Sequence, residues 1–188
     1  MHFGHSLVGV EIAVALVNTG IGEEELKGVA ELREFAQEHL LFGTPVSDAD
    51  LVPVYRVRDE LRRVLTTTDV EEAASVLNAL ARNTPAHPRM RRHDGLDWHV
   101  DWQNEGATLA EHILAQTVVG LMMYLSNAGY RRIRVCGRDD CERLFVDTTR
   151  NRSKRFCDGR NCGGRTHAQN FRERHRRASR REIGRAHV

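Results

Sequence analysis

Residues 136–162 read CGRDDCERLFVDTTRNRSKRFCDGRNC and hold all four cysteines of this 188-residue chain. The cysteines form two C-x4-C pairs with 15 residues between them: Cys136, Cys141, Cys157 and Cys162. Two short pairs around a hairpin-length insert predict a Zn²⁺ site, because zinc takes four thiolates in a tetrahedron. Four protein ligands leave no open position for catalysis, so the predicted zinc is structural.

Two other uses of the same cysteines stay open at this point, because the x4 spacing is wider than the common x2 knuckle. A disulfide pair would need an oxidising compartment, and an iron–sulfur cluster would use four thiolates as well. The apolar stretch at residues 7–17 is a poor export signal, since Glu11 interrupts it and no Lys or Arg precedes it. The other long apolar run, residues 113–125, is shorter than the ~18 residues of a membrane-spanning helix. We therefore expect a cytoplasmic protein that does not enter a membrane.

Charge divides the chain just before the first cysteine. Residues 1–130 hold 10 Lys and Arg against 19 Asp and Glu, a net charge of −9, whereas residues 131–188 hold 18 against 7, a net charge of +11. So large an asymmetry favours a polyanion partner for the C-terminal part, most simply nucleic acid. Docking of the two oppositely charged parts on each other is the alternative.

The N-terminal part predicts a helical domain. Apolar residues recur at helical spacing through residues 29–40, 54–65 and 70–80. Capping boxes predict where two helices begin, one at Asp69 with Glu72 and one at Thr108 with Glu111. The second box opens a long helix with a wide apolar face, which we expect to be central in the core.

A hairpin interrupts the helices between residues 84 and 105. Trp98, Val100 and Trp102 alternate with His99 and Asp101, which predicts a strand with the indoles on one face and the polar pair on the other. We expect this polar pair on the open face of the hairpin, in contact with solvent. The partner strand is expected at residues 89–92, joined to it by a turn at residues 94–95, Asp-Gly.

Around the cysteines, the pattern predicts strands at residues 131–135 and 144–146 and a helix that starts just after Cys162, with Thr166 and Gln169 as its capping box. One narrow face of that helix, containing Phe171 and His175, is expected to pack against the finger. The predicted fold is thus mainly α with a small β-hairpin: an N-terminal helical domain, followed by a small α+β zinc finger of treble-clef-like or ribbon-like form.

Basic side chains crowd the tip of the insert and both flanks of the last helix. Phosphate contacts are expected for most of them, because cations without neighbouring acids repel one another until an anion neutralises them. Arg165, next to Cys162, is the better candidate for base readout. The predicted nucleic-acid-binding residues are Arg152, Lys154, Arg155, Arg165, Arg172, Arg176 and Arg180.

The same residues carry a resemblance to a known family. The cysteine spacing, residues 145–147 (Phe-Val-Asp), the basic run into Cys157 and residues 162–165 (Cys-Gly-Gly-Arg) resemble the CGNR-type zinc finger of bacterial stress-induced transcription regulators. Residues 16–19 (Leu-Val-Asn-Thr) resemble the opening motif of their helical domain, called ABATE. The chain departs from the family pattern at Gly164 in place of Asn, at Phe156 in place of Trp and at Ala15 in place of Asp, and these departures leave the cysteines untouched.

The resemblance implies a regulator that binds DNA, and the charge division favours the same function. RNA binding, a protein-interaction zinc module and a redox sensor that releases zinc on thiol oxidation are the alternatives. Few aromatic residues accompany the basic ones, so single-strand stacking is poorly supported. The histidines show no nucleophile–base spacing and no deaminase or phosphate-loop motif, and we expect no enzyme. The helical domain is expected to bind a small effector or to form a homodimer.

The predicted domains are residues 1–130, residues 131–178 and a basic tail at residues 179–188. The last seven residues, 182–188, read EIGRAHV, which back-translates to the start of a widely used sequencing adapter. We expect adapter read-through here and leave these residues out of the fold prediction.

Overall fold

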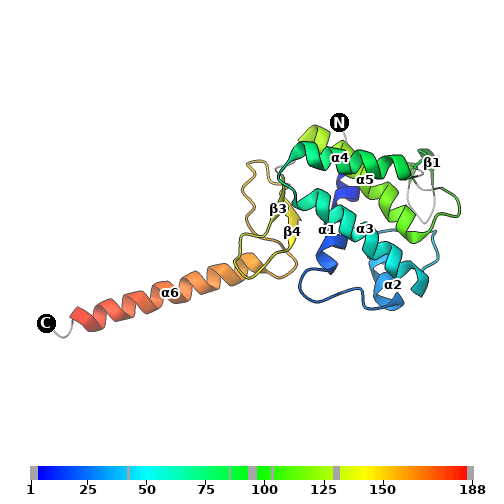
Figure 1. The fold of residues 1–188 in the computed structure, drawn as a ribbon. Coiled ribbons are helices and arrows are strands. Elements are labelled where there is room, and N and C mark those ends of the chain that lie inside the picture. The colour runs from blue at the N-terminus through cyan, green and yellow to red at the C-terminus, as the bar shows by residue number, and fades with distance from the viewer. Residues whose placement is uncertain are drawn as a thin grey trace. The chain divides into compact units, whose positions relative to one another are not determined.

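A computed structural model describes residues 4–41, 43–84, 86–92, 97–102, 104–128 and 132–185. It separates into two compact units, residues 1–132 and residues 133–188 (Figure 1). Unit 1 is helical with one small hairpin, and unit 2 holds a second hairpin, the four cysteines and a long helix. The predicted fold class, a mainly helical N-terminal region followed by a small finger, is confirmed. That each unit folds without the other remains a prediction.

Unit 1 buries one core between its helices. Fully buried side chains come from α1, α2, α3 and α5, and include Leu16, Leu32, Leu61 and Ile113. The helices are α1 (Gly4–Thr19), α2 (Val29–Glu38), the 3-10 helix η1 (Asp48–Asp50), α3 (Leu51–Thr66), α4 (Val70–Asn83) and α5 (Leu109–Ala128).

The centre of the core is a close crossing of α1 and α5. At Gly9, a Cβ would lie 2.3 Å from the carbonyl oxygen of Gln116 and 2.9 Å from the Cα of Gly120, so glycine lets the two backbones touch. By length and composition, residues 109–127 of α5 could also cross a membrane, as the central helix of a packed core can. Here α5 buries Leu109 and Leu121 completely, which agrees with its predicted central position.

Helices α4 and α5 begin where the capping boxes predicted, but the box at Asp69 has different hydrogen-bond partners from those predicted. The Thr108 amide donates to the Glu111 carboxylate at 2.8 Å and the Glu111 amide donates to the Thr108 hydroxyl at 3.3 Å, a complete capping box. The Asp69 carboxylate caps α4 by accepting from the Glu71 amide at 2.9 Å. The Glu72 carboxylate accepts instead from the hydroxyl of Thr67 at 2.5 Å.

The hairpin of unit 1 has the predicted pairing but not the predicted faces. β1 (Arg89–Arg91) pairs antiparallel with β2 (His99–Asp101), with Met90 opposite Val100. Asp101 is 2% exposed, with its carboxylate 3.7 Å from the Arg91 guanidinium, while Trp98 is 62% exposed. The expected outward polar pair is therefore wrong for Asp101, because an ion pair allows the carboxylate to be buried. The side chain of His99 and the predicted turn at residues 94–95 lie outside the described residues.

Unit 2 begins with β3 (Ile133–Val135), which pairs antiparallel with β4 (Leu144–Val146). Helix α6 (Cys162–Arg185) then runs as one long helix from the finger (Figure 1). Since α6 starts at Cys162, Thr166 is inside the helix and its hydroxyl donates to the Cys162 carbonyl at 2.9 Å, so the predicted capping box at Thr166 is wrong. Phe171 is 56% exposed, and its ring lies tilted against that of His175 with the ring centroids 4.2 Å apart, so this face does not pack against the finger as expected.

Candidate metal centre

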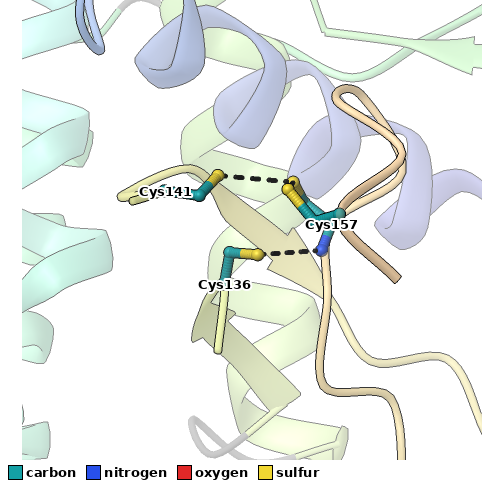
Figure 2. A group of neighbouring side chains, drawn as sticks. Cys136, Cys141 and Cys157 are labelled. Atoms are coloured by element: carbon teal, nitrogen blue, oxygen red, sulfur yellow. Dashed lines mark hydrogen bonds between the residues drawn. The ribbon is translucent and has the colours of Figure 1, made fainter. Parts of the chain in front are cut away.

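The local fold of unit 2 brings the four cysteines together. Cys136 follows β3 directly, Cys141 ends the turn between the strands, and Cys162 is the first residue of α6. All four side chains are buried, and their Sγ atoms lie within 4.8 Å of one another. The Sγ atom of Cys157 is 3.7 Å from that of Cys141 (Figure 2). It is also 3.7 Å from that of Cys162.

These separations fit a zinc tetrahedron. With Zn–S bonds of about 2.3 Å, the sulfur atoms of a tetrahedral site lie about 3.8 Å apart. A disulfide would bring two sulfurs to about 2.05 Å, and all four cysteines are free thiols in the structure. The disulfide alternative therefore receives no support, whereas the donor set and its spacing suit Zn²⁺.

Backbone groups fix the turns that present the sulfurs. The Cys136 amide donates to the Arg143 carbonyl at 2.9 Å, and the Cys157 amide donates to the Cys136 sulfur at 3.4 Å. The Gly137 amide donates to the Arg155 carbonyl at 2.7 Å, and a Cβ on Gly137 would lie 2.9 Å from that same oxygen. Only glycine permits this approach, which ties the first cysteine pair to the segment carrying the second.

Burial sets the protonation of the thiols when no cation is near. For Cys162, burial and, after it, the hydrogen bonds with the neighbouring thiols raise the pKa to about 12. For Cys157, burial also raises the pKa. Burial opposes ionisation of Cys136 too, but backbone amides of Cys157 and Arg138 donate to its sulfur, and its pKa falls below the ordinary value. Four closely spaced thiolates need a cation to neutralise them, which is the chemistry a bound Zn²⁺ supplies.

A buried carboxylate shapes the insert between the cysteine pairs. Asp147 is fully buried at the end of β4 and accepts hydrogen bonds from the Thr149 amide at 3.0 Å and the Lys154 amide at 3.1 Å. Arg134 on β3 lies 3.4 Å from the Asp147 carboxylate and donates to the Lys154 carbonyl at 2.9 Å. Burial opposes the charge on Asp147, but hydrogen bonds from the Thr149 hydroxyl and from the Thr149 and Lys154 amides hold its pKa below the ordinary value. The basic tip of the finger is therefore anchored to both strands.

The structure distributes the predicted nucleic-acid-binding residues over the tip and α6. Two of them are already in ion pairs: Lys154 with Asp158 at 2.6 Å, and Arg165 with Asp140 at 3.2 Å. Four are exposed, with no acidic partner among the described residues: Arg152, Arg155, Arg172 and Arg176. Arg180 lies within α6, but its side chain is outside the described residues.

One polar residue at this surface, Asn161, was not among the residues predicted from the sequence. Asn161 lies in the turn between Cys157 and Cys162 and has a φ of 47°, in the left-handed region that non-glycine residues seldom adopt. Its side chain is exposed at the edge of an open cleft of about 510 Å³. A lone Asn in a turn carries no periodic signal, so no pattern in the sequence could have selected it.

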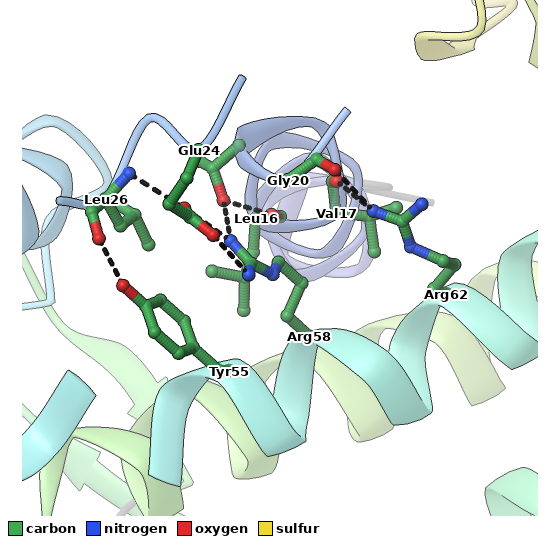
Figure 3. Close-up of polar contacts among 9 residues, drawn as sticks. Leu16, Val17, Gly20, Glu24, Leu26, Tyr55, Arg58 and Arg62 are labelled. Carbon is green, nitrogen blue, oxygen red and sulfur yellow. Dashed lines mark hydrogen bonds and ion pairs between the residues drawn. The ribbon is translucent and has the colours of Figure 1, made fainter. Parts of the chain in front are cut away.

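Unit 1 contains a second polar cluster, next to the Asn-Thr pair at the end of α1. The Arg58 guanidinium, on α3, is nearly buried and donates to both oxygens of Glu24, at 2.7 and 2.6 Å (Figure 3). It also donates to the Thr19 hydroxyl at 3.1 Å and lies 4.5 Å from the centre of the Tyr55 ring. A Cβ on Gly20 would lie 2.9 Å from the Arg58 Cζ, so glycine leaves room for the guanidinium. This cluster holds the loop after α1 against α3.

We expect Glu24→Gln to destabilise unit 1 by about 1–3 kcal/mol, because it leaves the buried Arg58 without its anionic partner, while the partial exposure of Glu24 limits the cost. The hydrogen bonds from Arg58 lower the pKa of the Glu24 carboxyl. The pair therefore stabilises the fold above the unfolded pKa of about 4.3, and this stabilisation is lost as the pH falls through the folded pKa.

Urea unfolding at pH 6 and at progressively lower pH measures this effect, with the exposed Glu23→Gln as control. Both tryptophans lie in unit 1, so their fluorescence reports on this unit alone. The stability difference between Glu24→Gln and the unchanged protein should shrink in acid. A difference that is absent at pH 6, or that grows in acid, contradicts the assigned pair.

Comparison with known families covers nearly the whole chain. Residues 11–123 match the ABATE model, described as "Putative stress-induced transcription regulator". Residues 132–175 match the CGNR zinc finger model. No curated protein matches the chain. The zinc-finger match, together with the buried four-cysteine cluster, confirms Zn²⁺ as the cofactor. The chain thus belongs to the ABATE family of stress-induced transcription regulators and carries a C-terminal CGNR zinc finger.

Proposed function

We propose that this protein is a zinc-dependent DNA-binding transcription regulator of the bacterial cytoplasm, and that its zinc ligands are Cys136, Cys141, Cys157 and Cys162. One observation carries the proposal. Arg172 and Arg176 are exposed on a helix whose first residue, Cys162, belongs to the buried thiol cluster. Zinc at that cluster would fix the start of the helix and so place its arginines relative to the finger.

The charge of unit 2 supports a polyanion as the partner. Residues 131–188 have a net charge of +11 from their side chains. Zinc with four thiolates carries about −2, which leaves the finger and α6 strongly cationic. Duplex DNA presents a regular line of phosphates, and neutralising them releases condensed counterions.

The basic residues differ in what they can offer a phosphate. Arg155, Arg172 and Arg176 are exposed without an acidic partner among the described residues, so they can bind phosphate at no cost in lost ion pairs. Lys154 and Arg165 would have to share or leave Asp158 and Asp140. We therefore propose that α6 and Arg155 supply most of the affinity, with Lys154 and Arg165 in a secondary role.

The proposed role is regulatory and not catalytic, in keeping with the description of the family as a transcription regulator. Zinc bound by four thiolates has no open coordination position, so the site would stabilise the finger and would not catalyse a reaction. The helical unit would then serve the finger as a partner or sensor domain.

Competition binding tests the choice of DNA. The zinc-loaded protein is bound to labelled duplex DNA and displaced by unlabelled duplex DNA, by single-stranded RNA and by heparin at constant ionic strength. Duplex DNA should compete best per unit of charge, since the proposal assigns the surface to duplex phosphates. Stronger displacement by RNA, or a complete lack of duplex binding, contradicts the proposal.

A further inference from the structure

The cleft beside the second cysteine pair has a mixed polar lining that a phosphate would not need. Its lining includes the cations Lys154 and Arg155, the carboxylate of Asp158 and the amide of Asn161. Phosphate oxygens only accept hydrogen bonds, and a nearby carboxylate repels them. Base edges present donors and acceptors side by side, so this lining suits a base edge better than a phosphate.

Asn161 is the one side chain at this cleft with an unused donor and an unused acceptor. Lys154 and Asp158 pair with each other at 2.6 Å, and Arg155 lies over the Phe156 ring at 5.7 Å. The Asn161 amide makes no hydrogen bond within the described part of the chain, and its side chain is exposed. An Asn amide can pair with both N6 and N7 of adenine in the major groove.

Main-chain hydrogen bonds order the backbone that carries this amide. The Asn161 amide nitrogen of the main chain donates to the Asp158 carbonyl at 3.0 Å, and the Asn161 carbonyl accepts from the Arg165 amide at 3.0 Å. The first bond closes the turn between Cys157 and Cys162, and the second comes from the first turn of α6. Because the main chain at Asn161 is already ordered, only its side chain has to be ordered on binding, which lowers the entropic cost of a base contact.

Gly164 provides the space that the amide occupies. A Cβ on Gly164 would lie 2.7 Å from the Asn161 Oδ1, 3.0 Å from its Nδ2 and 3.1 Å from its Cγ. The family takes its name from the letters C-G-N-R, whereas this chain reads C-G-G-R at residues 162–165. The Asn161 side chain therefore lies where a side chain at position 164 would begin.

We infer that Asn161 determines the base specificity of this protein by pairing with the edge of an adenine in the major groove. The inference rests on the proposed DNA binding and adds the residue and the base that it reads. Lys154 and Arg155 flank the amide and would meet the adjacent phosphates. Arg165, held by Asp140, would position the finger and not read a base.

Two substitutions test the inference in the full-length, zinc-loaded protein. Asn161→Ala removes the amide. Gly164→Ala leaves every hydrogen-bonding group in place, but its methyl group displaces the amide. Ala is also a better helix residue than Gly, so this variant should not unfold α6. Asn170→Ala, an exposed asparagine farther along α6, is the matched control.

The preferred duplex is first selected from a randomised pool, and affinity for it and for random duplex is then measured at constant salt. A bidentate base contact corresponds to about 5- to 150-fold in discrimination. Asn161→Ala and Gly164→Ala should each lower the ratio of specific to random affinity within that range, at a position where the unchanged protein prefers adenine. Random-duplex affinity and zinc content should stay unchanged, and Asn170→Ala should keep the full ratio.

Two results overturn the inference and leave the proposed function standing. In the first, Asn161→Ala keeps the full preference for its selected duplex. In the second, it weakens specific and random duplex by the same factor, which makes the amide a phosphate contact. Failure of the unchanged protein to bind any duplex would overturn the proposed function itself.

Discussion

Removal of zinc is expected to unfold residues 133–176 while residues 1–132 keep their helices. Zinc contributes roughly 10–16 kcal/mol to folding in isolated finger peptides. Unit 2 buries few apolar side chains beside its cysteines: Ile133, Leu144, Phe145 and Val146. So small a core is not expected to keep the unit folded without metal, because small domains usually need a metal or disulfides for stability. We expect unit 1 to stay folded without zinc, because it buries a hydrophobic core of its own.

Two-dimensional NMR of the full chain, with and without a zinc chelator, measures this directly. Amide signals from residues 133–176 should collapse to unfolded positions, while those of residues 1–132 and the tryptophan fluorescence stay unchanged. Cys157→Ser should give the same spectrum without chelator, and Asn170→Ala should not. Metal analysis should find one zinc per chain in the unchanged protein. Iron with visible absorbance, or a finger that stays folded without metal, would reject the assignment.

The second large effect concerns α6. Replacing Arg172 and Arg176 with Ala is expected to weaken binding to all duplex sequences alike and to flatten its dependence on salt. Each phosphate contact contributes about −0.9 to the slope of log K against log salt. If five phosphates are neutralised, the unchanged protein should show a slope of about −4.5, and the double variant one of about −2.7.

A control with the same charge change separates this effect from net charge. Arg56 and Arg82 are exposed on α3 and α4 of unit 1, so Arg56→Ala with Arg82→Ala removes two positive charges far along the sequence from the finger. This control should keep a slope near −4.5. Equal slopes for the α6 variant and the unchanged protein would show that α6 does not contact DNA phosphates.

The sequence predicted those features that depend on spacing. The cysteine pattern predicted the buried cluster, and the apolar stripes predicted α2, α3 and α4. Helix α1 was missed because it is apolar on nearly all sides, as a helix in contact with both α3 and α5 can be. Its sequence therefore lacks the polar face that marks an amphipathic helix.

Other features depend on pairs of residues that are distant in sequence, and no local pattern carries them. Arg58 and Glu24 are 34 positions apart, and the buried Asp101 forms an ion pair with Arg91 across the hairpin. The Asn161 side chain occupies space that is free because Gly164 has no side chain. In the sequence, Gly164 is visible only as a departure from the C-G-N-R pattern of the family. Each of these features arises from a contact between two residues, and such a contact leaves no periodic pattern in the sequence.

We propose above all that DNA binds to the part of unit 2 that zinc keeps folded. The most direct test is to measure the affinity for duplex DNA while zinc is removed and then restored. The affinity of the full chain for duplex DNA is measured with zinc bound, after chelation and after zinc is restored, at constant ionic strength. The account predicts that chelation abolishes tight binding and that zinc, but not magnesium, restores it. Equal affinity with and without zinc would contradict the account.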